Sequence, residues 1–242
     1  MPNLNPIDAQ LLQIVSGASP ASIADVIAVM WSIDGLLPGD DGLKWFNRLY
    51  LMVTQEIDAP PAANGWKDAT WLARLDVVFA TFYFAAITDA LRQNADTPSS
   101  WDALFEARAS AGVDRIQFAL AGMNAHINHD LALALMKTND QLHLTPALQS
   151  PQHDDYERVN GLLEEVLPSA LNLLATGIVG ELAQDSGKIG RLLAIWNVCA
   201  ARDLAWDFAN HLRNLGGMSR ELALEAQDKL TGVIGRSLLL PL

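Results

Sequence analysis

The sequence has a single cysteine, Cys199, among its 242 residues. One thiol can form neither a disulfide within the chain nor a thiolate cluster around a metal. Positive charge is also scarce, because 16 Lys and Arg stand against 28 Asp and Glu and the formal net charge is -12 at pH 7. Such a surface repels the phosphates of nucleic acids and of anionic membranes. We therefore expect no nucleic-acid partner and no membrane partner.

Long hydrophobic runs are missing as well. The longest apolar stretch, around residues 77–87, is much shorter than the ~20 residues that cross a bilayer. The first residues, MPNLNPIDAQLLQIV, contain neither the basic segment nor the small-residue cleavage site of a secretory signal. These absences predict a cytoplasmic protein.

Several common functional motifs are absent too. The sequence contains no G-x-G-x-x-G, no G-x-x-x-x-G-K-[ST], no G-x-S-x-G and no H-E-x-x-H. The segment DGLLPGDDG does not have the spacing of a calcium-binding loop. No E-x-x-H pair is present, which argues against a ferritin-like di-iron site. These absences exclude the most easily detected nucleotide, hydrolase and metal sites.

Apolar residues, 50% of the chain, recur at the i, i+3, i+4 spacing of helices and never alternate as in strands. Asp40 or Asp41, Asn64, Thr97, Ser150 and Ser219 are expected N-caps. Pro168 is expected to bend or restart its helix. We predict helices over residues 6–15, 21–33, 42–57, 66–94, 98–108, 113–137, 151–167, 189–215 and 219–237, and a short one after residue 176.

Two of these helices, residues 66–94 and 113–137, are apolar on most sides, as expected for helices at the centre of a domain. The sequence shows no internal repeat, no low-complexity tract and no linker. It therefore predicts an all-α fold: residues 1–242 form a single-domain helical bundle around two central apolar helices.

The second central helix contains the segment GMNAHINHDL, which places five polar residues in an apolar environment. His126 and Asp130 lie one turn apart on one face, and His129 lies on the flank of that face. Gly122 precedes them on the same side and lets another element approach closely. Asn124 falls on the opposite face, as do Asn128 and Gln117, where these side chains could bond to other helices.

This cluster has three interpretations. His126 and Asp130 could bind one divalent metal, such as zinc or iron, because imidazole and carboxylate at i, i+4 form helical ligand pairs. A carboxylate beside an imidazole also suits a general base. Finally, a fully paired polar network could simply fix the register of the helix.

Other helices offer partners for the cluster. Asp76 lies on the inner face of the first central helix, so it meets a cation or a metal, pairs with Arg108 or Arg202, or stays protonated with a raised pKa. Tyr83 shares the face of Asp76. His153 begins the helix after residue 150 and is either part of the site or simply near the surface.

From these patterns we predict a buried site between the two central helices. The predicted catalytic residues are Asp76, His126, His129, Asp130 and His153. The predicted metal ligands are His126, Asp130 and Asp76. The predicted substrate-binding residues are Asn47, Tyr50, Tyr83, Asn124, Tyr156, Asn160 and Arg202.

Five segments together resemble a bacterial family of all-helical proteins that is labelled only as a domain of unknown function. They are LPGDDGLKWFNRLYLMVT, ARLDVVFATFYFAAI, QFALAGMNAHINHDLALAL, HDDYERVN and the AR-x-x-AW pattern at residues 201–206. The resemblance covers most of the chain but supplies no reaction. It implies a shared polar set of Asp76, His126, His129, Asp130, His153, Tyr156, Asn160 and Arg202. A looser analogy is to zinc-dependent phospholipase C and P1-type nucleases, which also bind metal through helical H-x-x-x-D pairs, although this chain does not have their full ligand set.

Three functions follow as hypotheses. The first is an enzyme that acts on a small, largely apolar substrate with a divalent metal, in hydrolase-type chemistry. The second is a metal-free cyclase or isomerase of secondary metabolism, in which Asp76 or His126 moves protons. The third is a non-catalytic binder of a small lipophilic molecule, with a purely structural polar cluster.

Overall fold

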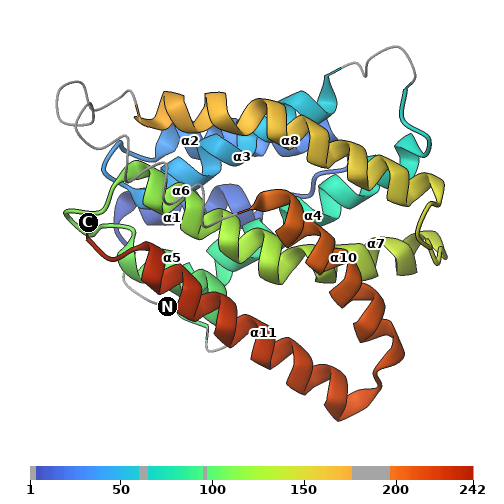
Figure 1. Ribbon diagram of the computed structural model, residues 1–242. Helices are drawn as coiled ribbons and strands as arrows, with labels where there is room; N and C mark the ends of the chain where they lie inside the picture. Colours follow the sequence, from blue (N-terminus) through green and yellow to red (C-terminus); the bar gives the residue numbers. More distant parts are fainter. Residues whose placement is uncertain (1–3, 60–64, 95–96, 176–196, 242) are drawn as a thin grey trace.

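Figure 1 shows the computed structural model of the chain, which describes residues 4–59, 65–94, 97–175 and 197–241. Every regular element in these ranges is helical and none is a strand, so the predicted all-α fold is confirmed. The elements are α1 (Pro6–Ser16), α2 (Ile23–Leu36), α3 (Gly42–Asp58), α4 (Ala69–Arg92), α5 (Ser99–Ala107), α6 (Arg115–Ala125), the π-helix η1 (His126–Asp130), α7 (Leu131–Leu142), α8 (Pro151–Ala175), α10 (Val198–Asn214) and α11 (Gly217–Leu238).

Two aspartates cap the starts of α3 and α4. Asp41 caps α3 as predicted, and its carboxylate accepts a hydrogen bond from the Leu43 N–H. Asp68 caps α4 by accepting from the Trp71 N–H. The predicted cap Asn64 lies outside the described residues. Because a carboxylate at an N-cap satisfies a free N–H and also interacts favourably with the helix dipole, both starts are well defined.

Helix α5 is capped from a distant part of the chain. Its first N–H groups, on Ser99 and Ser100, donate to the Asp228 carboxylate of α11 at 2.8 and 3.0 Å. The predicted cap Thr97 is wrong, because Pro98 holds the N-cap position and makes no side-chain cap bond. A tertiary contact therefore replaces the local cap.

The remaining corrections concern helix ends. Helix α8 continues through Pro168 to Ala175, so the proline does not restart it. Helix α11 begins at Gly217, two residues before the predicted cap Ser219. The short helix expected after residue 176 and the expected helical residues 189–196 lie outside the described residues.

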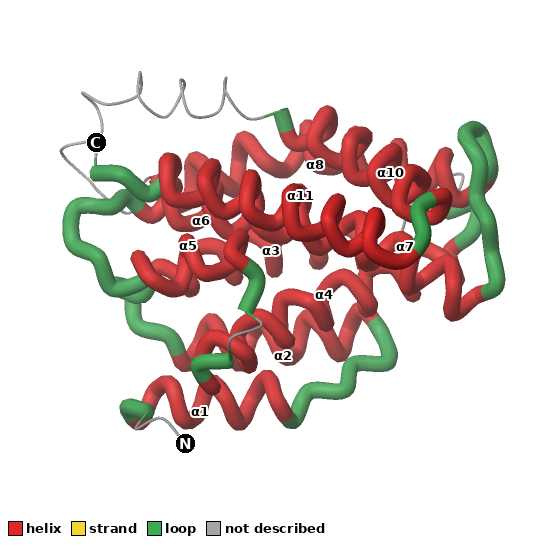
Figure 2. Tube along the Cα trace, turned by 90° about the horizontal axis from the view of Figure 1, so that it is seen from below, coloured by secondary structure: helices red, strands yellow, loops and turns green. Residues whose placement is uncertain are grey.

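The two predicted central helices occupy the middle of the bundle. The second one is a single run of three elements, α6, η1 and α7, and it packs against α3, α4, α5, α8, α10 and α11. Figure 2 shows this arrangement from below. The first central helix, α4, packs against α7 and α1, and most of its side chains are buried.

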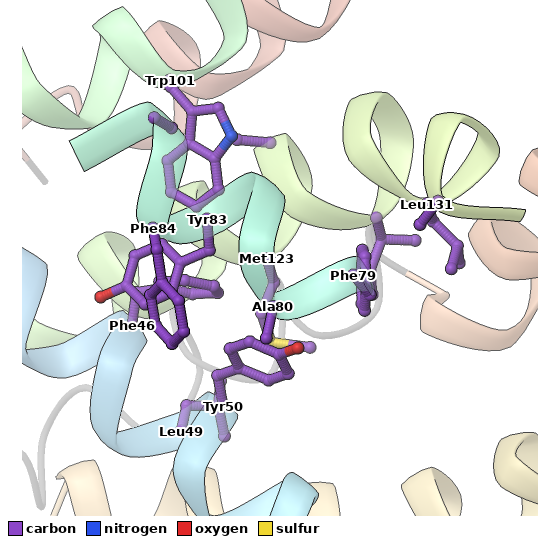
Figure 3. Packing of buried hydrophobic residues seen from close by; sticks show 14 of the residues in the cluster. Phe46, Leu49, Tyr50, Phe79, Ala80, Tyr83, Phe84, Trp101, Met123 and Leu131 are labelled. Atoms are coloured by element: carbon purple, nitrogen blue, oxygen red, sulfur yellow. The ribbon is translucent and has the colours of Figure 1, made fainter. Parts of the chain in front are cut away.

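One glycine allows two helices to touch closely at the centre. A Cβ on Gly122 of α6 would lie 2.3 Å from the Phe46 ring of α3, which is far inside the contact distance. Phe46 also packs edge-on against Tyr83 and Trp101, with ring centroids 5.0 and 5.3 Å apart (Figure 3). The close approach predicted from Gly122 is thus confirmed, and it brings α3 against the polar segment of the central helix.

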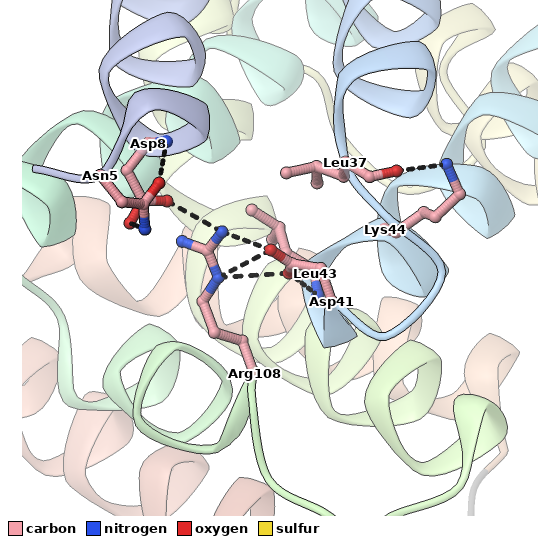
Figure 4. Close-up of polar contacts among 7 residues, drawn as sticks. All are labelled: Asn5, Asp8, Leu37, Asp41, Leu43, Lys44 and Arg108. Atoms are coloured by element: carbon pink, nitrogen blue, oxygen red, sulfur yellow. Dashed lines mark hydrogen bonds and ion pairs between the residues drawn. The ribbon is translucent and has the colours of Figure 1, made fainter.

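A partly buried ion cluster ties the N-terminal helix to the bundle (Figure 4). Arg108, after α5, binds Asp41 at the start of α3, and its Nη2 also lies 3.0 Å from the Asp8 carboxylate of α1. Burial lowers the pKa of Arg108, but the two carboxylates outweigh this effect and the net shift is upward. Arg108 is therefore already paired, and the alternative that it neutralises Asp76 is wrong.

Within the described ranges, α4 is the one helix long and apolar enough to cross a membrane. The central helix of a folded domain passes the same test, and 67% of the most apolar window of α4 is buried inside the protein.

Candidate functional site

The polar segment of the central helix is not a regular α-helix. Residues His126–Asp130 form one π-helical turn, in which the Leu131 N–H donates to the His126 carbonyl five residues back. Such a turn inserts one extra residue and is common at functional sites. Here it changes the helix register at the point where the two histidines and Asp130 occur.

His126 and Asp130 form a buried pair that Trp101 extends. Nδ1 of His126 lies 2.8 Å from Oδ2 of Asp130, and Nε1 of Trp101 donates to the same oxygen at 2.9 Å. Burial lowers the pKa of His126 well below its ordinary value, so the imidazole is neutral. Burial also raises the pKa of Asp130 to about 7, against the opposing effects of His129 and Trp101. When Asp130 is ionised, the proton of His126 must lie on Nδ1 and Nε2 carries a lone pair.

The other side of the His126 ring faces a cavity of about 70 Å³. One water needs only about 10–15 Å³ on this measure, so the space holds several waters or a small molecule. The ring stacks on Phe79 with centroids 3.5 Å apart and planes 5° from parallel, and it meets the Tyr50 ring edge-on at 4.7 Å. Twelve of the sixteen lining residues are apolar. The four that carry polar groups are Tyr50, Asp76, His126 and Arg202.

Three buried polar atoms on this cavity have no hydrogen-bond partner within the described part of the chain. They are Nε2 of His126, Oδ2 of Asp76 and the hydroxyl oxygen of Tyr50. A buried polar atom without a partner costs about 1–3 kcal/mol. Three of them around one cavity are hydrogen-bonding groups that a molecule bound there could use.

Asp76 lines the cavity, and the pKa of its carboxyl is strongly raised. Its residue is 6% exposed, and burial, with a smaller contribution from Asp58, raises its pKa to about 7. No Lys, Arg or His lies within salt-bridge distance of it among the residues with described side chains. Of the outcomes that the sequence left open, a protonated carboxyl is the one that the surroundings favour.

Arg202 of α10 lines the cavity, and two residues of α8 hold it there. Its Nε donates to Asn160 Oδ1 at 2.6 Å and its Nη2 to the Tyr156 carbonyl at 3.2 Å. The Tyr156 hydroxyl in turn donates to the Arg202 carbonyl at 2.6 Å, and the guanidinium lies 4.2 Å from the centre of the Tyr156 ring. Tyr156 and Asn160 therefore position Arg202, and neither lines the cavity itself.

Four of the other predicted site residues lie away from the cavity. Asn47 donates to the Met30 carbonyl and accepts from the Tyr83 hydroxyl, so Asn47 and Tyr83 satisfy each other inside the core. Asn124 faces the opposite side of its helix and donates to the Thr231 carbonyl of α11. His153 packs edge-on against Trp206, with Nε2 3.6 Å from Glu157.

His129 lies behind the pair rather than on the cavity. Its Nδ1 is 3.6 Å from Asp228 of α11, and its Nε2 is 4.0 Å from Oδ1 of Asp130. It thus connects the His126–Asp130 pair to the carboxylate that caps α5. Its electrostatic effect on Asp130 is to lower the pKa of that carboxyl.

The predicted metal ligands do not converge on one point. Asp130 directs Oδ2 at His126 and Trp101 rather than at a shared ion. In the described ranges, no group of three His, Cys, Asp or Glu side chains is arranged to hold a metal. A metal bound here would have to use Nε2 of His126 and Asp76, with Asp130 orienting the imidazole. The predicted zinc or iron therefore stays a prediction, with this changed ligand set.

The sequence did not indicate two residues of the site. Trp101 is fully buried and donates to Asp130, while Phe79 carries the stacked His126 ring. A buried tryptophan needs an acceptor for its N–H, which was the one available signal for Trp101. The π-turn had no signal in the pattern of residues.

The fold and the cavity define an all-α protein with a buried carboxylate–imidazole pair, whose imidazole lines an apolar pocket. This chain belongs to a family of unknown function (DUF5995), whose family model matches residues 23–241. The family resemblance in the sequence is thereby confirmed. No curated protein and no solved structure matches the chain, so the analogy to zinc-dependent phospholipases gains no support.

Proposed function

We propose that this protein is an enzyme that transfers protons on a small, largely apolar substrate bound in the cavity between α3, α4, the central α6–η1–α7 helix, α8 and α10. The observation that carries the proposal is the Nε2 atom of His126. It is buried and has no partner among the described residues, its residue lines the cavity, and Nδ1 on the same ring is bonded to the carboxylate of Asp130.

Each group has a role that its surroundings support. His126 is neutral and acts as the general base, while Asp130 holds the tautomer with a free Nε2 and stabilises the imidazolium that forms. Asp76, with a pKa raised to about 7, can supply a proton to the other end of the substrate. A base and an acid that share one pocket, as His126 and Asp76 do, are typical of acid–base catalysis.

The apolar walls favour a cofactor-free isomerase or cyclase over a hydrolase. Twelve of the sixteen lining residues offer no hydrogen bond to a hydrolytic water. A largely apolar substrate fits these walls, and its exclusion of water strengthens the electrostatic effect of the few polar groups. Metal-dependent hydrolysis would instead require both Nε2 and Asp76 as ligands.

The test is a panel of small compounds, each with a hydrocarbon body and one polar group, that covers ketones, esters, nitroalkanes and alkenes. Binding is measured by the rise in melting temperature, and chemistry by mass spectrometry of products and of deuterium taken up from heavy water. We expect at least one class to bind and to react. His126→Gln should then lose about 10²- to 10⁴-fold in rate, the usual contribution of a general base.

His143→Gln is the matched control, because His143 is exposed after α7. It should keep the full rate. The proposal is overturned if no class both binds and reacts, or if both histidine variants behave alike. Elemental analysis of the purified protein tests the metal-dependent alternative, which requires stoichiometric zinc, iron or another divalent metal.

A non-catalytic binder of a lipophilic molecule is the second candidate, favoured by the apolar lining of the cavity. It predicts that compounds raise the melting temperature equally in wild type and His126→Gln, with no product and no deuterium exchange. The same panel therefore separates the two candidates.

A further inference from the structure

The three unpartnered atoms of the cavity differ in what they can do. Nε2 of His126 is an acceptor, because Nδ1 holds the proton toward Asp130. The Tyr50 hydroxyl is a donor that makes no hydrogen bond of normal geometry. Burial and the nearby Asp76 and Asp130 raise its pKa well above the ordinary value, against a smaller opposing effect of the neighbouring Thr54 hydroxyl, so it keeps its proton. Oδ2 of Asp76 becomes a donor when the carboxyl is protonated. The cavity thus combines one base with two O–H donors.

One base and two donors in an apolar pocket match a particular chemical problem. Removal of a proton from carbon beside a carbonyl group leaves an enolate, whose charge gathers on the oxygen. Hydroxyl and carboxylic-acid donors stabilise such an oxyanion, and a carboxyl kept neutral by apolar surroundings can donate in this way. A plain hydrocarbon would leave all three polar atoms unsatisfied.

We infer that the substrate is a small apolar ketone or enone, whose carbonyl oxygen binds between the Tyr50 hydroxyl and the Asp76 carboxyl while His126 removes a proton from the adjacent carbon. This inference rests on the proposed function and names its substrate class. The rings of Tyr50 and His126 are in edge-on contact at 4.7 Å, so donor and base border the same small space.

The reaction balances without a cofactor. Nε2 takes the α-proton as the C–H bond breaks, and the electron pair forms the C=C bond of the enolate while the oxygen becomes negative. In a β,γ-unsaturated ketone, the imidazolium then returns the proton to the γ-carbon and the double bond moves into conjugation. The proton, the base and both donors finish in their starting states, and no oxidant or reductant is involved.

The first experiment measures binding of para-nitrophenol, whose ionised form is a stable mimic of an enolate. Nitrobenzene is the comparison ligand, because it has the ring and the nitro group but not the phenolic oxygen. We expect wild type to bind para-nitrophenol at least about tenfold more tightly, since a hydrogen bond to a charged group contributes this much. Equal affinity for the two ligands would overturn the inference.

Tyr50→Phe and Tyr83→Phe form a matched pair of variants. Both tyrosines are buried, but the Tyr83 hydroxyl is paired with Asn47 and lies off the cavity. Tyr50→Phe should lose most of the preference for para-nitrophenol and leave the nitrobenzene affinity unchanged, whereas Tyr83→Phe should keep the preference. Loss in both variants, or in neither, would contradict the assignment. If Tyr50→Phe does not fold, Asp76→Leu, which removes the other proposed donor, serves for the same comparison.

The second experiment follows conversion of a β,γ-unsaturated cyclohexenone to its conjugated isomer by ultraviolet absorbance. We expect Tyr50→Phe to lower the rate about 10²- to 10³-fold, the usual cost of one oxyanion donor. If His126-dependent chemistry occurs only on esters or nitroalkanes, the inference of a ketone or enone substrate fails and the proposed function stands. If no compound class reacts, both fail.

Discussion

The central helix has two polar faces, and they differ in one respect. On the face toward α11, Asn124 donates to the Thr231 carbonyl and accepts from Asn128, while Gln117 donates to the Leu238 and Leu240 carbonyls. On the face toward α3 and α4, His126 and its neighbours leave three buried atoms unpaired within the described structure. The paired face holds the bundle together, whereas the unpaired face presents polar atoms that a molecule in the cavity could bind.

The largest expected effect that tests this comparison is the loss of activity in His126→Gln. We expect about 10²- to 10⁴-fold on the reaction of the proposed substrate, because the general base is removed. The free energy of unfolding should fall by only about 1–3 kcal/mol, because the variant loses the Nδ1–Asp130 hydrogen bond and the stack on Phe79, while Nε2 has no partner to lose. Kinetics and urea denaturation on the same protein check both parts. A large loss of stability with unchanged activity would make the unpaired face structural.

The next effect is the pH dependence of stability, which Asp76 should dominate together with Asp130. Burial raises the pKa of Asp76 to about 7 from 3.8. Below about pH 4 the carboxyl is protonated in both states and no stability is lost. As the pH rises toward 7, the unfolded chain ionises while the folded protein keeps the proton, so stability falls by up to about 4 kcal/mol. Above pH 7 this loss is complete.

Asp76→Asn should remove the contribution of Asp76 to this decline. The groups around Asp76 are Asp58, Tyr50, His126 and Arg202, and Asp130, whose pKa is also raised to about 7, keeps its own decline in the variant. Urea denaturation across about pH 4 to 8 should therefore give a shallower fall than in wild type. An unchanged pH dependence would show that Asp76 is not buried as described.

On the paired face, Asn124→Leu should reverse the pattern seen for His126. The variant leaves the Thr231 carbonyl without its donor and removes the acceptor of Asn128, so it should cost about 1–3 kcal/mol in the free energy of unfolding. Activity per folded molecule should stay close to that of wild type, because Asn124 does not line the cavity. A selective loss of activity would place Asn124 in the site, where the sequence pattern had put it.

The sequence predicted that the central helix has two polar faces, but it did not predict which residues of other helices belong to each face. Helical spacing separated Asn124 from His126 and Asp130, and the structure agrees, because that separation depends only on local geometry. The fates of Asn47, Tyr83 and His153 depend on partners from other helices, which spacing cannot supply. For the same reason, Thr97 was expected to cap α5, although Asp228, 129 residues from Ser99, performs that role.

The smallest expected effect is that of Trp101→Phe on the pKa of Asp130, the residue that links the two faces of the central helix. Asp130 accepts from Trp101, and His129 joins it to Asp228 on the paired side. Phenylalanine keeps most of the ring but removes the N–H that stabilises the ionised carboxylate. The pKa of Asp130 should therefore rise by about one unit, which corresponds to about 1.4 kcal/mol.

Because the proposed base needs an ionised Asp130, the rising limb of the pH–rate profile should shift upward by the same amount in Trp101→Phe. The falling limb, which follows ionisation of the Asp76 donor, should stay where it is in wild type. A pH–rate profile checks the shift, and a merely structural tryptophan would lower the rate equally at every pH. Trp71→Phe is the control, because Trp71 is also fully buried but donates its N–H to Asn139, away from the pair. If both tryptophan variants gave the same profile, Asp130 would not control the tautomer of His126, and the unpaired Nε2 would no longer identify a base.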